Sequence, residues 1–337
     1  MSFEKTNKLS KIDLRLLQQL PYEIKVAKTK LRITEWYNFW CGNIGVNFSG
    51  GLDSLVLLHL TRSLYPMTPA ISVPTIECKE NQELISNTEN VIKLKPIYSM
   101  VEVNNKFGIP IGSKKVAKSI RRLQNPTPRN EASRNLALNG ITRAGNKCDR
   151  YKLPKKWIKL VESPFRVSEQ CCYYMKEKPF DDYARKSGIH YLYGTKATDS
   201  QTRESAYLVN GCNSFKGKGK STPLGFWTDQ DILRYIVENN LTYSKAYGQI
   251  INKNGIYKTT KASRTGCFMC LFGLHMEKQP NRLQRMEIEE PKKYDYVINK
   301  LGYKDILEYM DIPYRSDQIK EQKGILTNQI SMFDLKA

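Results

Sequence analysis

The sequence predicts an α/β protein built on a doubly wound, mostly parallel sheet. We expect a helix before the sheet and a smaller, helical, cysteine-bearing region after it. Short apolar runs that suit buried strands alternate with longer segments of helical period. One of these runs, Asn43–Phe48, leads directly into a glycine turn and an apolar helix. A strand, a tight turn and a helix in succession are the unit from which parallel sheets are assembled.

The remaining elements follow from the same patterns. Tyr22 to Trp40 has a helical period and should dock against the sheet. Thr228 and Asp231 should begin a helix whose apolar positions include Ile232 and Ile236. Further strands are expected at 69–76, 96–101 and 190–193. We expect the chain to divide into three consecutive parts: an N-terminal helical segment (1–41), the sheet domain (42–245) with a basic insertion near 112–160, and a C-terminal region (246–337).

The turn after the first strand is Ser49-Gly50-Gly51-Leu52-Asp53-Ser54. Paired glycines before a helix direct backbone N–H groups and the positive end of the helix dipole at an anion. Ser49 and Ser54 add hydroxyls, and Asp53 suits this setting if it orients a divalent metal or the loop itself. These residues therefore predict a phosphate site, with a serine-capped structural turn as the alternative.

The same six residues resemble the Ser-Gly-Gly-x-Asp-Ser loop of the PP-loop ATP pyrophosphatases, which cleave ATP to AMP and pyrophosphate. The resemblance implies that ATP with Mg²⁺ binds at Ser49, Gly50, Gly51, Asp53 and Ser54. It also implies that ATP adenylates a substrate oxygen, which a nucleophile such as sulfur then displaces.

Four of the eight cysteines form two pairs, Cys171-Cys172 and Cys267-Phe268-Met269-Cys270. Four thiolates suit an iron–sulfur cluster or zinc, and unligated structural cysteines are the third possibility. The vicinal pair followed by Cys-x-x-Cys resembles the adenylyl-sulfate reductase branch of the phosphoadenosine phosphosulfate (PAPS) reductase family. That resemblance implies a [4Fe–4S] cluster on these four residues. Lys176 is close enough in sequence to offset cluster charge, or is simply solvated, and His275 is a candidate fifth member of the site.

The stretch Gly194-Thr195-Lys196-Ala197-Thr198-Asp199-Ser200-Gln201-Thr202-Arg203 also resembles this family, in its Gly-x-Arg-x-x-x-Ser-x-x-Arg loop, with Lys196 in place of the first arginine. The resemblance implies that Lys196 and Arg203 hold the nucleotide phosphates. With Asp53 they are the catalytic candidates.

Charge is the second informative feature, because 54 Lys and Arg against 33 Asp and Glu give a net charge of +21. Between Lys114 and Lys159 the only acids are Glu131 and Asp149. Such a basic stretch favours a nucleic-acid partner, with solubility or steering of a small anionic nucleotide as the alternative.

The families that this sequence resembles include two activities, reduction of adenylyl sulfates and ATP-dependent sulfur transfer. Reductases of the family attack sulfate sulfur with a cysteine in a C-terminal Glu-Cys-Gly-Leu-His motif, whereas the segment 323–337 contains no cysteine. The intact glycine loop and the missing thiol favour ATP-dependent sulfur transfer onto nucleic acid, with a cysteine desulfurase or another sulfur donor as partner. An adenylyl-sulfate or PAPS reductase is the first alternative, and a non-catalytic, zinc-containing nucleic-acid binder is the second.

The N-terminus has no apolar signal core, and no stretch approaches the length of a membrane span. We therefore expect a cytoplasmic protein without a membrane partner that folds without disulfides. The sequence does not indicate its oligomeric state.

Overall fold

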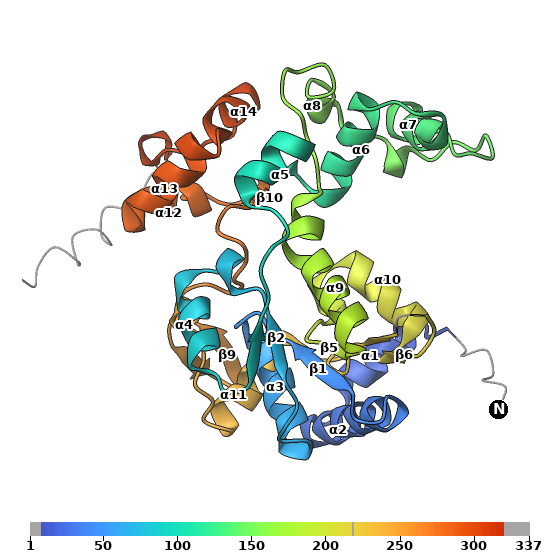
Figure 1. Cartoon of the computed structure of the whole chain (residues 1–337), viewed down its shortest axis with the longest axis vertical. Helices are drawn as coiled ribbons and strands as arrows, with labels where there is room; N and C mark the ends of the chain where they lie inside the picture. The colour runs from blue at the N-terminus through green and yellow to red at the C-terminus, as the bar shows by residue number, and fades with distance from the viewer. Residues whose placement is uncertain (1–7, 218, 320–337) are drawn as a thin grey trace, which may run out of the picture. The chain divides into compact units, whose positions relative to one another are not determined.

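A computed structural model describes residues 8–217 and 219–319. The N-terminal residues 1–7 and the segment 323–337, on which part of the sequence argument depends, lie outside the described residues. The chain forms two compact units (Figure 1). The sheet unit combines the chain up to Ile97 with Met175–Phe268, and the helical unit combines Tyr98–Tyr174 with the chain from Met269 onward.

The sheet unit confirms the predicted fold class. Its six strands are ordered β3-β2-β1-β5-β7-β6, and all neighbouring pairs are parallel except β6 with β7. The strands are β1 (Ile44–Asn47), β2 (Ala70–Ser72), β3 (Val91–Lys93), β5 (His190–Tyr193), β6 (Asn213–Ser214) and β7 (Lys220–Ser221), and a separate hairpin consists of β8 (Ile250–Lys253) and β9 (Ile256–Thr259).

Helices cover both faces of this sheet (Figure 1). Leu192 of β5 packs in the core cluster that includes α3, whereas its neighbour Tyr191 packs edge to face against Phe180 of α9. Successive strand residues point to opposite faces, so α3 and α9 lie on opposite sides of β5. The helices of this unit are α1 (Lys11–Gln19), α2 (Tyr22–Phe39), α3 (Leu52–Leu64), α4 (Lys79–Asn87), α9 (Lys178–Ser187), α10 (Gln201–Asn210) and α11 (Asp229–Glu238).

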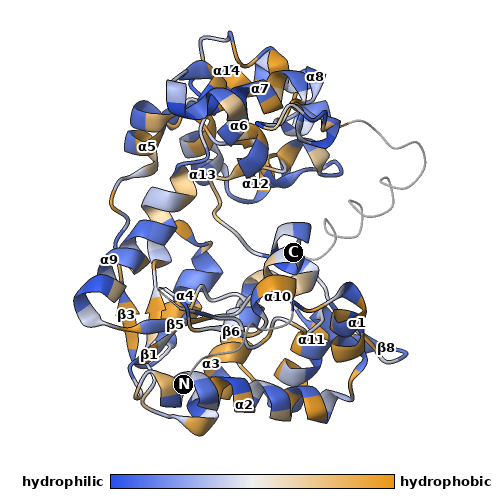
Figure 2. Cartoon of the chain, turned by 90° about the vertical axis from the view of Figure 1, so that its right-hand side faces the viewer, coloured by the Kyte–Doolittle hydropathy of each residue, from blue (hydrophilic) through white to orange (hydrophobic). Residues whose placement is uncertain are grey.

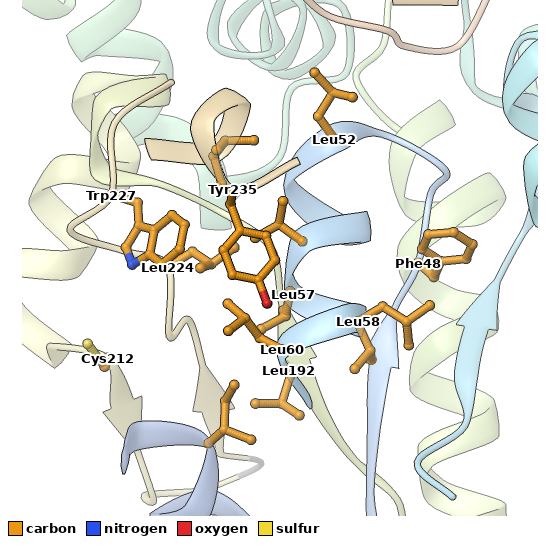
Figure 3. Close-up of a cluster of buried hydrophobic side chains, with 14 of the residues drawn as sticks. Phe48, Leu52, Leu57, Leu58, Leu60, Leu192, Cys212, Leu224, Trp227 and Tyr235 are labelled. Atoms are coloured by element: carbon orange, nitrogen blue, oxygen red, sulfur yellow. The ribbon is translucent and has the colours of Figure 1, made fainter. Parts of the chain in front are cut away.

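The core of the sheet unit lies between β1, β5, α2, α3 and α11 (Figure 3). Leu57 and Leu60 are fully buried on the inner side of α3, and Trp227 is fully buried before α11. Trp227 donates a hydrogen bond from Nε1 to Thr29 Oγ1 of α2 at 2.8 Å, which satisfies its polar atom inside an apolar cluster.

The helical unit contains the basic insertion. Its short parallel sheet pairs β4 (Ile111–Gly112) with β10 (Leu271–Phe272), residues that are far apart in the chain. Its helices are α5 (Met100–Phe107), α6 (Lys114–Gln124), α7 (Glu131–Asn139), α8 (Lys155–Ile158), α12 (Arg282–Glu289), α13 (Pro291–Asp295) and α14 (Tyr303–Tyr309). They carry polar and apolar residues side by side, as helices do when one face is buried (Figure 2).

Most predicted elements are confirmed, but the division of the chain and one strand differ. Two units, each made of two chain segments, replace the three consecutive parts expected, because the β4–β10 pairing joins the insertion to the C-terminal region. The strand expected at 96–101 was wrong. Ser99 and Glu102 form a reciprocal cap that begins α5 at Met100, and the third strand is β3.

The expected strand at 69–76 is confirmed only over β2, because Pro74 begins a short 3₁₀ helix. None of the described helices is both long and apolar enough to span a membrane.

A buried ion pair joins α2 to α11. Lys25 Nζ lies 2.9 Å from both carboxylate oxygens of Asp231, and both residues are buried. Asp231 also accepts hydrogen bonds from the backbone N–H and the hydroxyl of Thr228, at 2.7 and 2.8 Å. The predicted helix start is thereby confirmed, and it is tied to a neighbouring helix.

We expect Lys25→Met to destabilise the sheet unit by about 3 kcal/mol, because it leaves a buried carboxylate without its counter-charge. The double variant Lys25→Met/Asp231→Asn should recover much of this loss, since the amide is neutral and can still accept the Thr228 hydrogen bonds. Urea unfolding followed by tryptophan fluorescence measures both. Equal destabilisation in the single and double variants would contradict a charge-based role.

Candidate active site

The candidate site lies where two neighbouring parallel strands end. β1 continues into Ser49–Ser54 and β5 into Gly194–Asp199, and the two strands pair in register from Ile44 with His190 to Asn47 with Tyr193. β2 continues the sheet on one side of this pair and β7 on the other. The strand order reverses here, and the carboxyl ends of strands at such a switch point are where open α/β sheets bind ligands.

The glycine turn has the form predicted from the sequence. Gly50 has a φ of +73°, and a Cβ at this position would lie 3.0 Å from atoms of Asn81, so both backbone and space require glycine. Ser54 Oγ donates to the Gly51 carbonyl at 2.8 Å. Gly51 is the N-cap of α3 and has no side chain to cap that end. Backbone N–H groups of the first turn are therefore available to an anion.

Gly194 brings the two loops together. A Cβ on Gly194 would lie 2.8 Å from the backbone carbon and oxygen of Asp53 and 2.9 Å from the nitrogen of Ser54. Only glycine permits this approach without displacing the first turn of α3. The chain beyond Gly194 consequently reaches Lys196 directly beside Asp53.

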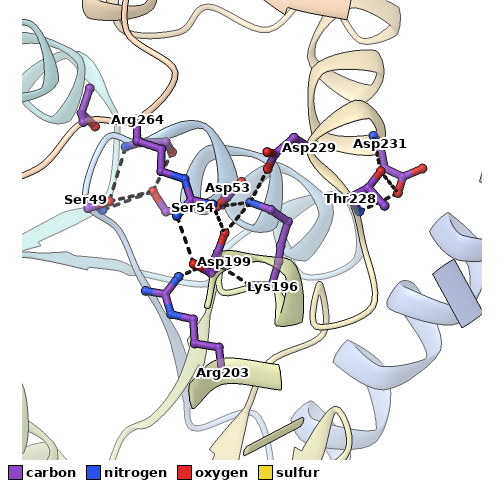
Figure 4. A network of polar contacts seen from close by, with 12 residues as sticks. Ser49, Asp53, Ser54, Lys196, Asp199, Arg203, Thr228, Asp229, Asp231 and Arg264 are labelled. Atoms are coloured by element: carbon purple, nitrogen blue, oxygen red, sulfur yellow. Dashed lines mark hydrogen bonds and ion pairs between the residues drawn. The ribbon is translucent and has the colours of Figure 1, made fainter. Parts of the chain in front are cut away.

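Lys196 is held by three carboxylates and is only 2% exposed. Its Nζ forms a short ion pair with Asp53 and lies 3.4 Å from Asp199 and 3.3 Å from Asp229 at the start of α11 (Figure 4). The structure thus brings Asp53 and Lys196 together, as both were predicted to be site residues. It adds Asp199 and Asp229, which the sequence analysis missed.

These contacts determine the ionisation of the group. Burial lowers the pKa of Lys196, but attraction to Asp53, Asp199 and Asp229 outweighs burial, and its pKa is raised. Burial also raises the pKa of Asp53, although Lys196 opposes that shift. Burial raises the pKa of Asp199, but the positive charges of Lys196, Arg203 and Arg264 outweigh burial, so this pKa is lowered. Lys196 is therefore a protonated cation at neutral pH.

Two arginines lie outside this buried group. Arg203 forms a short ion pair with Asp199, and Arg264 reaches the other oxygen of the same carboxylate at 2.8 Å. Their side chains remain 48% and 56% exposed, respectively. Of the two predicted phosphate-binding cations, Arg203 is accessible to a ligand, whereas Lys196 is enclosed by carboxylates.

A cavity of about 590 Å³ lies over the loop, within the usual size range of small-molecule sites. Its cationic lining residues are Lys196, Arg203, Lys258, Lys261 and Arg264, against the acids Asp53, Asp199 and Asp229. Lys258 belongs to β9, and Lys261 and Arg264 follow it; the sequence analysis did not assign this segment to the site. The sequence feature that could have pointed to these residues is the run of cationic and hydroxyl residues immediately before Cys267.

Asn81 of α4 joins the glycine turn to this cationic segment. Its Nδ2 donates to the Ser49 carbonyl at 3.1 Å and to Thr265 Oγ1 at 3.0 Å, and Thr265 contacts the Tyr247 hydroxyl at 2.9 Å. Asn81 is fully buried, and its Oδ1 has no hydrogen-bond partner among the described residues. The loop and the cationic segment are therefore held by one side chain.

The four predicted metal ligands fall in both units. Cys171, Cys172 and Cys270 belong to the helical unit and Cys267 to the end of the sheet unit. Cys171 is buried and the other three are partly buried. Over residues 8–217 and 219–319, no group of three or more His, Cys, Asp or Glu is arranged to hold a metal ion. The four-cysteine ligand set stays a prediction from the sequence.

Lys176 and His275, the two accessory candidates, have other neighbours. Lys176 pairs with the buried carboxylate of Glu77 at 3.0 Å, so it is not simply a solvated lysine. The ring of His275 packs edge to face against Trp157, with 4.8 Å between ring centroids.

Comparison with known proteins finds one family that part of the chain resembles. Residues 127–271 match the phosphoadenosine phosphosulfate reductase domain. Through this region the chain is similar to the PAPS reductase-like family. The match contains Lys196, Arg203 and all four paired cysteines, and it begins after the Ser49–Ser54 loop.

Several relatives of this protein are named adenosine 5'-phosphosulfate reductases. That of Staphylococcus epidermidis is 31% identical over 80 residues, which cover 24% of this chain and 32% of the relative. That of Oceanobacillus iheyensis is 34% identical, covering 24% of this chain and 33% of the relative. The match thus spans about a third of each relative. Among solved structures, a phosphoadenylyl-sulfate (PAPS) reductase from Candida auris in a phosphate complex is 15% identical, covers 70% of this chain and 90% of its own, and has a TM-score of 0.35.

We expect Asn81→Ala to loosen the segment 258–265, because two hydrogen bonds that hold it to the glycine turn are lost. At roughly 1 kcal/mol per bond, amide hydrogen exchange there should accelerate by about fivefold or more. Mass spectrometry of exchanged peptides measures this. The control is Asn87→Ala, on the exposed end of the same helix. Unchanged exchange in Asn81→Ala would contradict the bridging role.

Proposed function

We propose that this protein is an ATP pyrophosphatase and sulfurtransferase of the PAPS reductase family that acts on nucleic acid. The observation that carries the proposal is the cavity over the glycine turn at the β1–β5 switch point. It combines the N-terminus of α3 with cations from the loop after β5, from α10 and from the segment 258–264. That combination suits a polyphosphate, which needs both backbone N–H donors and mobile positive charge.

In the proposed complex the triphosphate lies on Gly50, Gly51 and the first turn of α3. Arg203 and Arg264, which are half-exposed, hold its phosphates together with Lys258 and Lys261. Lys196 is buried beneath Asp53 and acts on that carboxylate, so it is a positioning residue. Asp53 is the group that would orient Mg²⁺ beside the phosphates.

The proposed reaction has two displacements. A substrate oxygen attacks the α-phosphorus of ATP, the bond from that phosphorus to the oxygen bridging the α- and β-phosphates breaks, and pyrophosphate leaves. Positive groups already in place stabilise the charge that builds on the departing oxygens. A sulfur nucleophile then attacks the atom that bears the adenylated oxygen, the bond between that atom and the oxygen breaks, and AMP leaves with the former substrate oxygen.

The paired cysteines are the proposed ligands of a [4Fe–4S] cluster. Four thiolates are the donor set that such clusters use, and zinc accepts the same set. A cluster bound by Cys171, Cys172, Cys267 and Cys270 would supply a site for sulfur. The proposed sulfur source is a persulfide made by a cysteine desulfurase, and a thiol then cleaves the S–S bond between product and donor and is itself oxidised to a disulfide.

Sulfate reduction is the less favoured activity. Residues 271–337 contain no cysteine, so the chain beyond Cys270 offers no thiol to attack sulfate sulfur. The relatives named adenosine 5'-phosphosulfate reductases match about a third of their length. Support for a nucleic-acid substrate is the charge of +21 and the near absence of acids between Lys114 and Lys159.

The test is incubation of anaerobically purified protein with ATP labelled at the α- and γ-phosphates, in the presence of DNA or tRNA. We expect AMP and pyrophosphate, and a loss of at least ~100-fold in Asp53→Asn, because the variant removes the charge that orients metal and Lys196. Glu89→Gln, an exposed residue of the same unit, is the matched control.

Three results would oppose the proposal in different ways. If calorimetry detects no heat of ATP binding, the proposal that ATP binds at the glycine turn is wrong. Binding of nucleic acid without turnover would favour a non-catalytic binder. Sulfite released from adenylyl sulfate with a thiol donor would identify a reductase.

Metal content tests the cysteine ligands separately. We expect on the order of four iron and four acid-labile sulfide per chain after anaerobic purification. Cys172→Ser and Cys270→Ser should each lose most of the iron, and Cys148→Ser, in the same helical unit, should retain it. Zinc in place of iron would contradict the cluster assignment.

A further inference from the structure

The helical unit contains a cavity of its own, of about 450 Å³. One wall is formed by α8 and the residue after it, another by His275, and a third by the chain that follows α14. The lining residues are Lys155, Lys156, Trp157, Lys159, His275, Met310, Asp311, Ile312 and Pro313. All of them belong to the same compact unit.

The β4–β10 pairing positions two of these walls. Gly273 donates its N–H to the Gly112 carbonyl at 2.8 Å, directly after the paired residues Phe272 and Gly112. The chain then enters the 3₁₀ turn Leu274–Met276, which carries His275 to Trp157. Gly112 has a φ of +77°, and a Cβ there would lie 3.2 Å from the Trp157 ring.

The remaining wall is held by reciprocal hydrogen bonds. Lys159 Nζ donates to the Tyr309 carbonyl at 2.6 Å and lies 3.1 Å from Asp311 Oδ2, while the Tyr309 hydroxyl donates to the Lys159 carbonyl at 3.0 Å. The chain after α14 is therefore fastened to the chain after α8. The cavity is formed before any ligand arrives.

Its charge favours an anion. Asp311 is the only acidic residue among the lining residues, and Lys159 already contacts it. Lys155 and Lys156 are exposed, and neither has an ion pair with a described residue. Trp157, Met310, Ile312 and Pro313 supply apolar surface beside these two charges. A ligand that pairs with the two lysines and also covers the apolar surface has an anionic group and a flat apolar part.

His275 adds a hydrogen-bonding group. Its Nδ1 is buried and has no partner among the described residues. Burial, and then the charge of Lys156, lower the pKa of His275, so the ring is neutral at neutral pH. A neutral ring carries one proton, and a buried Nδ1 without an acceptor favours Nε2 as its position. Nε2–H is then the donor available to a ligand.

We propose that this cavity is a second ligand site, which binds a nucleoside monophosphate unit. The phosphate contacts Lys155 and Lys156, and the base lies against the apolar walls near Trp157 and Ile312. The unit is either a free mononucleotide or one residue of a single strand. Binding at this site needs no ATP cleavage, so it can be tested independently of the proposed reaction.

The test uses the fact that the chain has only three histidines, His59, His190 and His275. Full-length protein with isotope-labelled histidine is titrated, without ATP, with AMP and separately with a short deoxyadenosine strand, and imidazole signals are followed by NMR. We expect the His275 signals to shift while those of His59 and His190 stay in place. A shift with AMP identifies a free nucleotide, and a shift with the strand alone identifies a nucleotide within a chain.

The variant Lys155→Gln/Lys156→Gln should raise the Kd read from the His275 signals by about tenfold, because two charge-assisted contacts are lost. Lys292→Gln/Lys304→Gln changes net charge equally at two exposed positions of the same unit and should leave Kd unchanged. Near-ultraviolet circular dichroism that matches the unsubstituted protein confirms that each variant is folded. No His275 shift with either probe, or equal losses in both double variants, would overturn the proposal.

Discussion

The contact between Gly194 and the backbone of Asp53 and Ser54 is the constraint on which the candidate site depends. β1 and β5 run in parallel and in register, so their following loops leave the sheet at the same edge. A side chain on Gly194 would separate those loops by colliding with the first turn of α3. Without one, the β5 loop passes close enough for Lys196 to reach Asp53. The positions of the Asp199 carboxylate and of the two arginines on it follow from that approach.

This geometry sorts the charges of the site into two layers. Lys196 is almost fully buried, and a buried ammonium group is tolerable only with nearby carboxylates, which Asp53, Asp199 and Asp229 supply. The outer cations, Arg203, Lys258, Lys261 and Arg264, have exposed side chains. A buried layer thus holds the loop, while an outer layer is free to respond to an anionic ligand. Figure 4 shows how many of these side chains converge on the single carboxylate of Asp199.

The chain passes between its two units three times, and the sequence gives little indication of this. The pairing of Ile111–Gly112 with Leu271–Phe272 joins segments separated by about half of the chain. Each strand has only two residues, too short for any period to be recognised. This pairing also forms the second cavity, because it brings His275 to Trp157. The basic insertion and the region after the Cys-x-x-Cys motif are consequently one folded unit.

The sequence by itself determined the fold class and the glycine turn, because both depend on local chemistry, while Lys196 and Arg203 were predicted from the family resemblance. Strand, turn and helix follow one another within Asn43–Leu60, and glycine pairs and helix caps act over a few residues. Only the tertiary structure decided that Lys196 is enclosed, that Asp229 and Arg264 join the site, and that β3 rather than 96–101 is the third strand. These outcomes depend on which strands pair and which backbones approach, and residues distant in the chain settle both.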